Sequence, residues 1–276
     1  MNRRVLMVAY HFPPLAGSSG VQRTLRFAQY LPEFGWDPIV LTAHPRAYAR
    51  TSDDQLGDIG ERVEVIRAPA WDTARHFAFA GRYPRFLARP DRWISWWLGA
   101  APAGLRAIRR FRPDAIWSTY PIATAHRIGA TLAHRSGLPW IADFRDPMAQ
   151  EAYPRDPVTR RRFVAIERDT IRSAHRTTFT TPGAIDSYGE RYPDRRDRLR
   201  LVENGYDEET FAEVQAPDTP LNPGCLTLVH SGVVYPQERN PRQLFAALEV
   251  LKRESPETFG RLRVRFRAAV SESLLH

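Results

Sequence analysis

The sequence predicts an α/β fold built on a doubly wound parallel sheet. Short apolar runs rich in β-branched residues recur along the chain, and segments with apolar residues at helical spacing alternate with them. Apolar runs bounded by Pro and Gly are typical of buried strands, and the helical spacing indicates amphipathic helices. A glycine loop joins the first strand to the first helix. Strands and helices that alternate at short intervals are typical of a parallel sheet covered by helices.

The opening unit covers residues 4–34. Residues 4–10 predict a buried strand, and apolar residues recur at helical spacing from Val21 to Leu31. Residues 13–20 between them are rich in Pro, Gly and Ser. A glycine loop before a helix presents free N–H groups and the positive end of the helix dipole, an arrangement that binds anions. The loop residues are therefore candidate ligands of a phosphate-bearing substrate: Gly17, Ser18, Ser19 and Gly20.

A second interpretation of this loop stays open. The glycine spacing matches neither the dinucleotide fingerprint nor the P-loop, so a tight turn with a serine cap would explain it without a ligand. Arg23 favours the ligand, because a cation in the first helical turn opposes the helix dipole unless an anion lies between them. The alternative for Arg23 is a side chain that extends into water.

The remaining elements follow in alternation. Predicted strands cover residues 39–42, 63–66, 115–118, 140–143, 177–181 and 199–202, and predicted helices cover residues 120–136 and 157–174. The composition of residues 207–224 is typical of a linker, and a further strand, helix and strand follow at 226–229, 241–253 and 262–266. We therefore expect one domain at 1–205, a linker at 206–224 and the first βαβ part of a second domain at 225–276. One βαβ unit alone buries too little surface to be stable.

Residues 69–112 interrupt this alternation with several tryptophans among many arginines. Trp93, Trp96 and Trp97 would share one face of a helix. Such a stripe beside arginine suits contact with lipid headgroups at a membrane surface. Packing of the rings onto the sheet is the alternative, because aromatic stripes at helical spacing usually belong to a core.

Composition excludes several classes of function. The chain has 40 basic and 31 acidic residues, and Lys252 is its one lysine, so lysine-nucleophile chemistry is disfavoured and arginine is suited to bind phosphate or carboxylate. Cys225 stands alone, which favours a reducing compartment. No metal-ligand motif, signal-peptide pattern or nucleic-acid module is present. We expect a cytoplasmic protein, or one held at the inner face of a membrane, with neither a metal nor a nucleic-acid partner.

A dense polar group follows the predicted strand at 140–143. Ligands of parallel α/β folds bind at the carboxyl ends of strands, where Asp143, Arg145 and Asp146 fall, with Tyr120 after the preceding strand. We interpret Arg145 and Asp146 as candidate catalytic residues, and Tyr120 and Asp143 as candidate substrate-binding residues. An ion pair of Arg145 with either aspartate that merely shapes the loop is the alternative.

Three stretches in this order resemble GT-B glycosyltransferases of group 4: residues 11–42, NGYD at 204–207 and HSGVVYPQERNP at 230–241. The resemblance covers essentially the whole chain. It implies two Rossmann-like domains that face a cleft, with NGYD closing the first. It also implies transfer of a sugar, with retention, from a nucleotide-diphosphate sugar to an acceptor such as a glycan or lipid-linked saccharide in polysaccharide biosynthesis. No metal or other cofactor is implied.

The resemblance also implies roles for single residues. It places the loop at 17–20 near the donor phosphates and the acceptor, Gly232 in the first loop of the donor-side domain, and Arg239 near the diphosphate. A guanidinium there would offset the charge that develops on the departing phosphate, so we predict Arg239 to be catalytic.

The sequence departs from the family in two places. Many relatives carry a histidine beside the sugar after the fifth strand, where this chain has Arg145 and Asp146. The donor domain of the family also carries a Glu-x7-Glu element, and this sequence ends at His276 before reaching it. We therefore expect the 276-residue chain, as a fragment or truncated form, to turn over poorly. A non-catalytic binding module or an inactive remnant, associated with a membrane surface, is the alternative.

Overall fold

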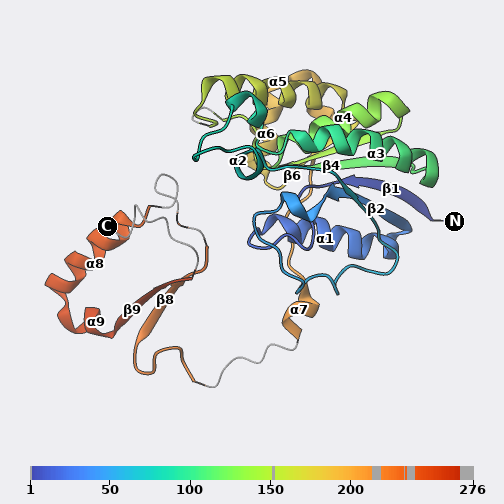
Figure 1. The fold of residues 1–276 in the computed structure, drawn as a ribbon. Coiled ribbons are helices and arrows are strands. Elements are labelled where there is room, and N and C mark those ends of the chain that lie inside the picture. Colours follow the sequence, from blue (N-terminus) through green and yellow to red (C-terminus); the bar gives the residue numbers. More distant parts are fainter. Residues whose placement is uncertain (1, 151–152, 213–218, 233, 235–239, 268–276) are drawn as a thin grey trace. The chain divides into compact units, whose positions relative to one another are not determined.

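The computed structural model describes residues 2–150, 153–212, 219–232, 234 and 240–267. The chain divides into two compact units, Met1–Asp207 and Glu208–His276, which are described separately (Figure 1). The predicted domain boundary after residue 205 lies beside this division. Part of the predicted linker is helical, because α7 covers Glu208–Ala212.

The first unit is organised around a seven-stranded sheet in the order β3-β2-β1-β4-β5-β6-β7, in which every pair of neighbours is parallel. This confirms the predicted fold class and each predicted strand of the unit. The strands are β1 (Arg3–Val8), β2 (Trp36–Ala43), β3 (Glu64–Ala68), β4 (Ala115–Thr119), β5 (Trp140–Arg145), β6 (Arg176–Phe179) and β7 (Leu199–Leu201).

Helices cover both faces of this sheet. Figure 1 shows α1 on one face and α3, α4, α5 and α6 on the other. The α-helices are α1 (Gly20–Tyr30), α2 (Thr73–His76), α3 (Ser95–Phe111), α4 (Ala123–Ser136), α5 (Pro157–Ser173) and α6 (Pro182–Arg191). Short 3-10 helices are η1 (Leu31–Phe34), η2 (Pro45–Ala47), η3 (Arg85–Ala88) and η4 (Pro193–Arg198).

Strand β1 shows why its sequence is an unbroken apolar run. Leu6 and Val8 point into the core shared with α3, α4, α5 and α6, whereas Val5 and Met7 point into the core shared with α1. Successive side chains of a strand lie on opposite faces, so a strand covered on both sides needs apolar residues at every position. Polar groups of this part of the chain that could bind a ligand therefore lie beyond the ends of β1 rather than within it.

The tryptophan stripe belongs to the core, so its interpretation as a membrane contact is wrong. Trp96 is fully buried, and Trp93 and Trp97 are partly buried against the same cluster. The Nε1 atom of Trp97 donates a hydrogen bond to Thr131 Oγ1 at 3.0 Å.

The prediction that residues 69–112 interrupt the alternation of strands and helices is wrong for residues 95–111, which form the helix α3. Glycines and a proline weaken the helical signal of this sequence, and packing explains the glycines. A Cβ atom on Gly99 would lie 2.3 Å from the carbonyl oxygen of Pro69. A Cβ atom on Gly104 would lie 2.7 Å from the side chain of Leu132 in α4. The glycine therefore lets two helices approach closely, which a single-sequence pattern does not reveal. Helix α6 was likewise not predicted.

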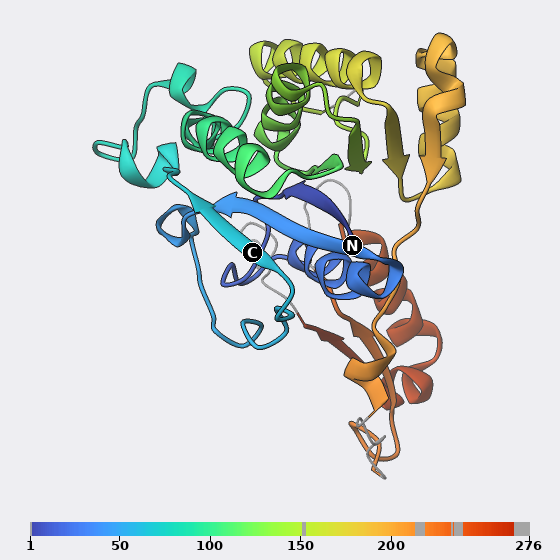
Figure 2. The same ribbon diagram turned by 90° about the vertical axis from the view of Figure 1, so that its right-hand side faces the viewer.

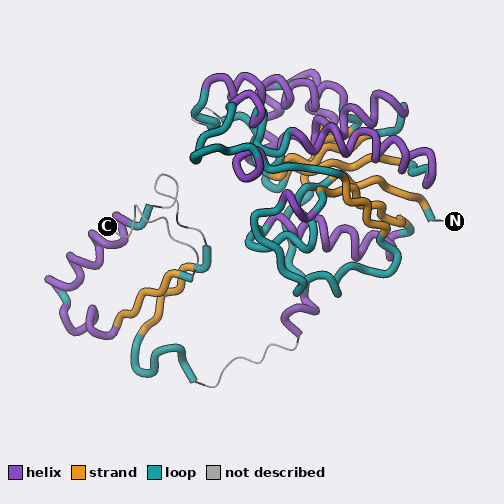
Figure 3. Tube along the Cα trace, viewed as in Figure 1, coloured by secondary structure: helices purple, strands orange, loops and turns teal. Residues whose placement is uncertain are grey.

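The second unit contains two parallel strands, β8 (Leu226–His230) and β9 (Leu262–Phe266), with the helices α8 (Arg242–Glu254) and α9 (Pro256–Arg261) between them in sequence (Figure 3). This confirms the predicted βαβ order. Leu226, Leu228 and Val229 remain exposed on β8. Gly232 lies just after β8, whereas Arg239 lies outside the described residues. No helix of the described chain is both long and apolar enough to span a bilayer.

Candidate functional site

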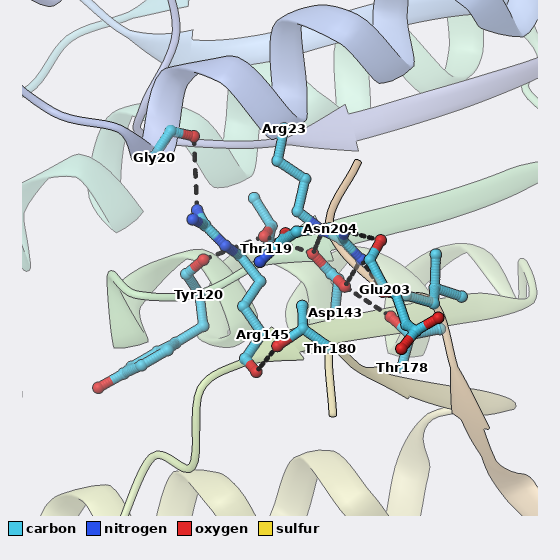
Figure 4. Close-up of polar contacts among 11 residues, drawn as sticks. Gly20, Arg23, Thr119, Tyr120, Asp143, Arg145, Thr178, Thr180, Glu203 and Asn204 are labelled. Atoms are coloured by element: carbon cyan, nitrogen blue, oxygen red, sulfur yellow. Dashed lines mark hydrogen bonds and ion pairs between the residues drawn. The ribbon is translucent and has the colours of Figure 1, made fainter. Parts of the chain in front are cut away.

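The order of strands reverses between β1 and β4, and this point lies at the centre of the first unit's sheet. In open α/β sheets the connections after two such strands leave in opposite directions, which opens a crevice at their carboxyl ends. The loop after β1, residue Tyr120 after β4 and Arg145 at the end of β5 all lie at this edge. Figure 4 shows the side chain of Arg145 directed toward Gly20, whose carbonyl accepts a hydrogen bond from Nη1 at 3.4 Å.

Two positions of the glycine loop, Gly17 and Gly20, require glycine. Gly17 has a φ of 78°, a conformation that L side chains rarely adopt. A Cβ atom on Gly20 would lie 2.1 Å from Nδ1 of His11. The hydroxyl of Ser18 accepts a hydrogen bond from the Gly20 amide at 3.2 Å and lies 3.5 Å from the same histidine nitrogen. The predicted serine cap is not formed, because Ser19 at the N-cap of α1 makes no side-chain capping bond, and Ser18 instead closes a local turn beside His11.

Backbone donors of this loop are unused. Within the described chain, the amides of Gly17, Ser18 and Ser19 donate no hydrogen bond, whereas those of Val21 and Gln22 donate to the carbonyls of Ser18 and Ser19. Consecutive free N–H groups before a helix attract an anion. The loop therefore keeps the backbone donors that the anion-binding interpretation requires.

Arg145 is the second source of unused donors. Its φ of 59° is unusual for a residue other than glycine, and it coincides with a shift of register between β5 and β6. The carbonyl of Arg145 accepts a hydrogen bond from Thr180 Oγ1 at 2.8 Å, which helps to fix this backbone. Its Nε atom is buried without a partner among the described residues. Burial lowers the pKa of the guanidinium, although a neighbouring aspartate opposes this.

The predicted ion pairs of Arg145 are not formed. In the part of the chain that the structure describes, no carboxylate oxygen lies within 4.0 Å of this guanidinium. Asp146 is exposed, and its amide donates to the carbonyl of Phe144 at 2.6 Å. Arg145 is thus a partly buried cation with unused donors at the edge where the sequence predicts a ligand.

His11 and Tyr120 complete this edge. Burial lowers the pKa of His11 to about 4, and the positive charge of Arg145 acts in the same direction. The imidazole is therefore neutral near pH 7. Tyr120 is buried, which raises the pKa of its phenol, and its ring points away from Arg23 and Asp143 (Figure 4). The sequence gave no signal for the contact of His11 with the glycine loop.

The side chain of Arg23 faces the protein interior, which contradicts both interpretations from the sequence. Nε and Nη2 donate to the two carboxylate oxygens of Asp143 at 3.0 Å each. Nη2 also donates to the carbonyl of Val202 at 2.9 Å, and Nη1 donates to Glu203 O at 3.1 Å and to Asn204 Oδ1 at 3.3 Å. A guanidinium has five N–H donors, and all are engaged. Arg23 therefore retains none for a phosphate.

Asp143 is equally saturated. Besides Arg23, its carboxylate accepts hydrogen bonds from Thr119 Oγ1 at 2.8 Å and from Thr178 Oγ1 at 2.7 Å, and its side chain is fully buried. Its predicted role in substrate binding is therefore replaced by a positioning role. The residue joins β4, β5 and β6 to α1 beneath the glycine loop.

The NGYD stretch is bound to the same helix. Asn204 accepts a hydrogen bond from Arg23, and Asp207 accepts one from the hydroxyl of Tyr30 at 2.9 Å and pairs with Arg26 at 3.2 Å. The resemblance implied that NGYD closes the first domain. In the structure these residues attach the exit of the first unit to the helix that carries the glycine loop.

The buried carboxylate of Glu167 lies apart from this edge, and its oxygens are occupied by hydrogen bonds from neighbouring residues. Glu167 accepts hydrogen bonds from Tyr188, Arg191, Tyr192 and the amide of Ala149 at 2.5–3.0 Å. It lines a cavity of about 340 Å³. Because these donors occupy the carboxylate, we assign Glu167 a structural role. Across the described residues, no three His, Cys, Asp or Glu side chains gather as metal ligands, and the expectation of a metal-free reaction stays a prediction.

Comparisons with known proteins agree with this fold. The profile of a family described as "glycosyl transferase 4-like domain" matches residues 19–205. No curated protein sequence matches the chain. Sucrose-phosphate synthase from Thermosynechococcus elongatus is similar in structure, with a TM-score of 0.55 and 12% identity over 96% of this chain and 70% of that one.

Two further solved structures are similar. Phytolacca americana UGT2, complexed with UDP-2-fluoro-glucose and pterostilbene, has a TM-score of 0.58 and 13% identity over 97% of this chain and 72% of that one. A UDP-N-acetylglucosamine 2-epimerase has a TM-score of 0.53 and 12% identity over 99% of this chain and 63% of that one. At such identities these likenesses show the fold alone, and the family match carries the functional argument.

Proposed function

The chain belongs to the glycosyl transferase 4-like domain family, and from this membership we propose that it acts in transferring a sugar from a nucleotide-diphosphate sugar to an acceptor. The family match over residues 19–205 is the observation that carries the proposal. The acceptor is a glycan or a lipid-linked saccharide, and the product belongs to polysaccharide biosynthesis. The bond from the anomeric carbon to the diphosphate breaks, a bond to an acceptor oxygen forms on the same face of the sugar, and the acceptor hydroxyl loses its proton.

Within the first unit, the unused donors support binding of an anionic oxygen of the donor diphosphate. The free amides at residues 17–19 approach it from the glycine loop, and Arg145 approaches from the end of β5. Donors aimed at an oxygen whose negative charge grows during departure lower the barrier, because they interact more strongly with the transition state than with the ground state. Arg145 is the cation we assign to this role.

The other residues of the site have supporting roles in this proposal. His11, neutral near pH 7, orients the loop through Ser18. Arg23 and Asp143 hold α1 at a fixed distance from β5. Tyr120, which is buried, stays a predicted substrate contact, and the exposed Asp146 stays a predicted catalytic residue. In the donor-side unit, Gly232 is a predicted substrate contact and Arg239 a predicted catalytic residue. The reaction is proposed to need no metal and to occur in the cytoplasm, at the inner face of a membrane.

A transfer assay tests the proposal. The purified 276-residue chain is incubated with radiolabelled UDP-, GDP-, ADP- and dTDP-sugars, each with glycan and lipid-linked acceptors, and labelled product is separated from free sugar. We expect label in the acceptor for one donor. If the nucleotide sugar is epimerised or hydrolysed and no acceptor is labelled, the proposed transfer is wrong and the chain catalyses another reaction.

Titration calorimetry with pyrophosphate tests the anion site independently of turnover. We expect Arg145→Gln to weaken pyrophosphate binding about 10- to 100-fold, since hydrogen bonds to a charged group contribute about 1.5–3 kcal/mol. Arg176→Gln is the matched control, because it removes an exposed guanidinium at the opposite end of the neighbouring strand β6. Equal losses in both variants would refute the assignment of Arg145. Saturable pyrophosphate binding without any transfer would favour the non-catalytic binding module.

A further inference from the structure

Large apolar side chains are exposed in one short segment between β3 and α3. We name residues 77–87 the docking lobe. Phe79 is 88% exposed and Phe86 is 72% exposed, and Phe77 and Leu87 are also exposed. Figure 2 shows this segment, in turquoise, projecting from the edge of the sheet. A gathering of exposed aromatic rings marks an interaction surface, because single exposed apolar residues are common but clusters are not.

The tip of the docking lobe is structured. Phe79 and Arg82 exchange two backbone hydrogen bonds, at 2.8 and 3.0 Å, around Ala80 and Gly81. Both central residues have positive φ, 48° and 74°, which is the two-residue turn typical of tight hairpins. The turn therefore holds the ring of Phe79 at a defined tip.

The base of the lobe is attached to the first unit. Thr73 Oγ1 donates to the carbonyl of Leu87 at 2.7 Å, which joins α2 to η3. Arg89 pairs with Asp156 at 3.3 Å, and Arg75 donates to the carbonyl of Tyr48. The exposed rings are thus held in place by neighbours that are themselves anchored.

Charge identifies the occupant of this surface. Residues 73–90 contain four arginines and neither Asp nor Glu. Arg82 and Arg85 are exposed beside the rings, and neither forms an ion pair with another described residue. Protruding aromatic rings with unpaired cations beside them fit a surface that is negative outside and apolar beneath.

We propose that the docking lobe binds an anionic lipid bilayer, with Phe79 and Phe86 inserted at the level of the acyl boundary and Arg82 and Arg85 on lipid phosphates. A bilayer suits this lobe better than a folded partner, because the ring of Phe79 protrudes from a tight turn and that of Phe86 from η3, and both need a surface that yields around them. The proposal concerns other residues than the buried tryptophan stripe, and it does not depend on the proposed transfer reaction.

Docking of the lobe on a bilayer would also position the candidate site relative to the lipid surface. Strand β3, which leads to the lobe through residues 69–76, ends at the same edge of the sheet as β1, which leads to the glycine loop. Arg67, the penultimate residue of β3, donates to the carbonyl of Pro13 at 2.8 Å, so the end of β3 is bonded to the start of the glycine loop. A bilayer that holds the lobe therefore holds the candidate site near the lipid surface, where a lipid-linked acceptor would be presented.

Vesicle sedimentation tests the proposal with the purified 276-residue chain. Vesicles are made either of phosphatidylcholine alone or of phosphatidylcholine and phosphatidylglycerol in equal parts. We expect binding to the anionic vesicles and its loss on adding salt. The pairs Phe79→Ser/Phe86→Ser and Arg82→Gln/Arg85→Gln are each expected to weaken binding about tenfold or more, since both apolar burial and headgroup attraction are needed.

Matched controls lie at the opposite edge of the sheet. Phe34 is 77% exposed in η1, just before β2, so Phe34→Ser removes a comparable ring. Arg106 and Arg109 are exposed in the second half of α3, so Arg106→Gln/Arg109→Gln removes the same charge. Both controls should bind vesicles as the parent chain does. All variants change exposed side chains, and an unchanged urea midpoint confirms that each is folded.

Several results would overturn the proposal. One such result is a parent chain that remains in solution with anionic vesicles. Another is a loss of vesicle binding in the control variants as large as that in the lobe variants. If vesicle binding requires Arg82 and Arg85 but persists in Phe79→Ser/Phe86→Ser, the proposed insertion of the rings into the bilayer is wrong. Association of the chain with itself that disappears in Phe79→Ser/Phe86→Ser, without vesicle binding, would assign the lobe to a second copy of this chain.

Discussion

Arg23 and Arg145 lie at the same edge of the sheet, on two sides of Asp143, and they differ in how their donors are used. Arg23 directs all five N–H groups to a carboxylate, backbone carbonyls and an amide oxygen. Arg145 makes one long hydrogen bond and leaves Nε without a partner within the described residues. The comparison shows that residue type does not decide function here. The saturated arginine is part of the framework, and the unsaturated one is available to a ligand.

The backbone differs in the same sense. Arg23 lies in regular helix, whereas Arg145 has a left-handed conformation at a break in the strand register. Such a conformation is unfavourable for a residue other than glycine and is found where surrounding structure enforces it. Arg23 should therefore contribute to the free energy of unfolding and Arg145 to anion binding. The following predictions test this difference between the two arginines.

Breaking the saturated pair should have the largest effect. Arg23→Leu leaves the carboxylate of Asp143 buried without its cation, and removing one partner of a buried pair costs about 3–5 kcal/mol. Urea unfolding of the parent and the variant, followed by tryptophan fluorescence, measures this loss. Arg196→Gln is the control, because its exposed pair with Asp186 at 3.4 Å should contribute at most about 1 kcal/mol.

The double variant Arg23→Leu/Asp143→Leu sharpens the same test. Removing both charges eliminates the unpaired buried carboxylate, so stability should recover part of the loss seen in Arg23→Leu. If the double variant is no more stable than the single one, the cost comes from the lost hydrogen bonds to residues 202–204 rather than from the uncompensated charge.

Acid should destabilise the first unit through buried histidine. His126 is fully buried, its Nε2 has no hydrogen-bond partner among the described residues, and burial lowers its pKa to about 3. The unfolded chain binds this proton near pH 6.5 and the folded chain near pH 3. Stability is therefore complete above pH 6.5 and falls as the pH drops toward 3, by up to about 1.4 kcal/mol per pH unit. His11, with a pKa of about 4, adds a smaller loss of the same sign.

The variant His126→Leu tests this assignment, with unfolding free energy measured in urea between pH 4 and pH 8. The variant should lose some stability at pH 7, because Ser118 loses a hydrogen-bond partner at 2.8 Å, but its stability should depend less on pH than that of the parent. Parallel pH profiles for both proteins would show that other groups control acid unfolding.

Replacing the unsaturated arginine should separate stability from binding. Arg145→Gly removes the guanidinium and suits the positive φ, so the unit should become more stable by up to about 1 kcal/mol while pyrophosphate binding falls about tenfold or more. The urea midpoint and calorimetry report the two effects separately. A large loss of stability in this variant would mean that Arg145 belongs to the framework as Arg23 does.

The smallest effect is expected where the exit of the first unit meets α1. Tyr30→Phe removes the hydroxyl that donates to Asp207 at 2.9 Å, and a typical hydrogen bond contributes about 0.5–1.5 kcal/mol. The change is measured by urea unfolding and should leave pyrophosphate binding unchanged. Weakened binding in Tyr30→Phe would show that the glycine loop senses how the exit segment is held.

Much of the architecture could be predicted from the sequence. The apolar runs at 4–10 and 140–143 became strands because both faces of the sheet are covered, and the alternation of strands with helices requires parallel pairing. The glycine loop could be located for a similar reason, since positive φ at Gly17 and the close approach of His11 to Gly20 each demand glycine locally. Helix α3 was missed because its glycines serve contacts with distant elements.

The sequence by itself therefore determined the fold class, the order of the strands along the chain and the edge at which we propose that a ligand binds, because these follow from periodicity and from the local chemistry of turns. Only the tertiary structure decided which arginine serves the framework, since the partners of Arg23 lie 120 and about 180 residues away in the chain. It also placed the tryptophans inside and the phenylalanines of the docking lobe outside. Both sets are aromatic and lie near arginine, so packing alone distinguishes them.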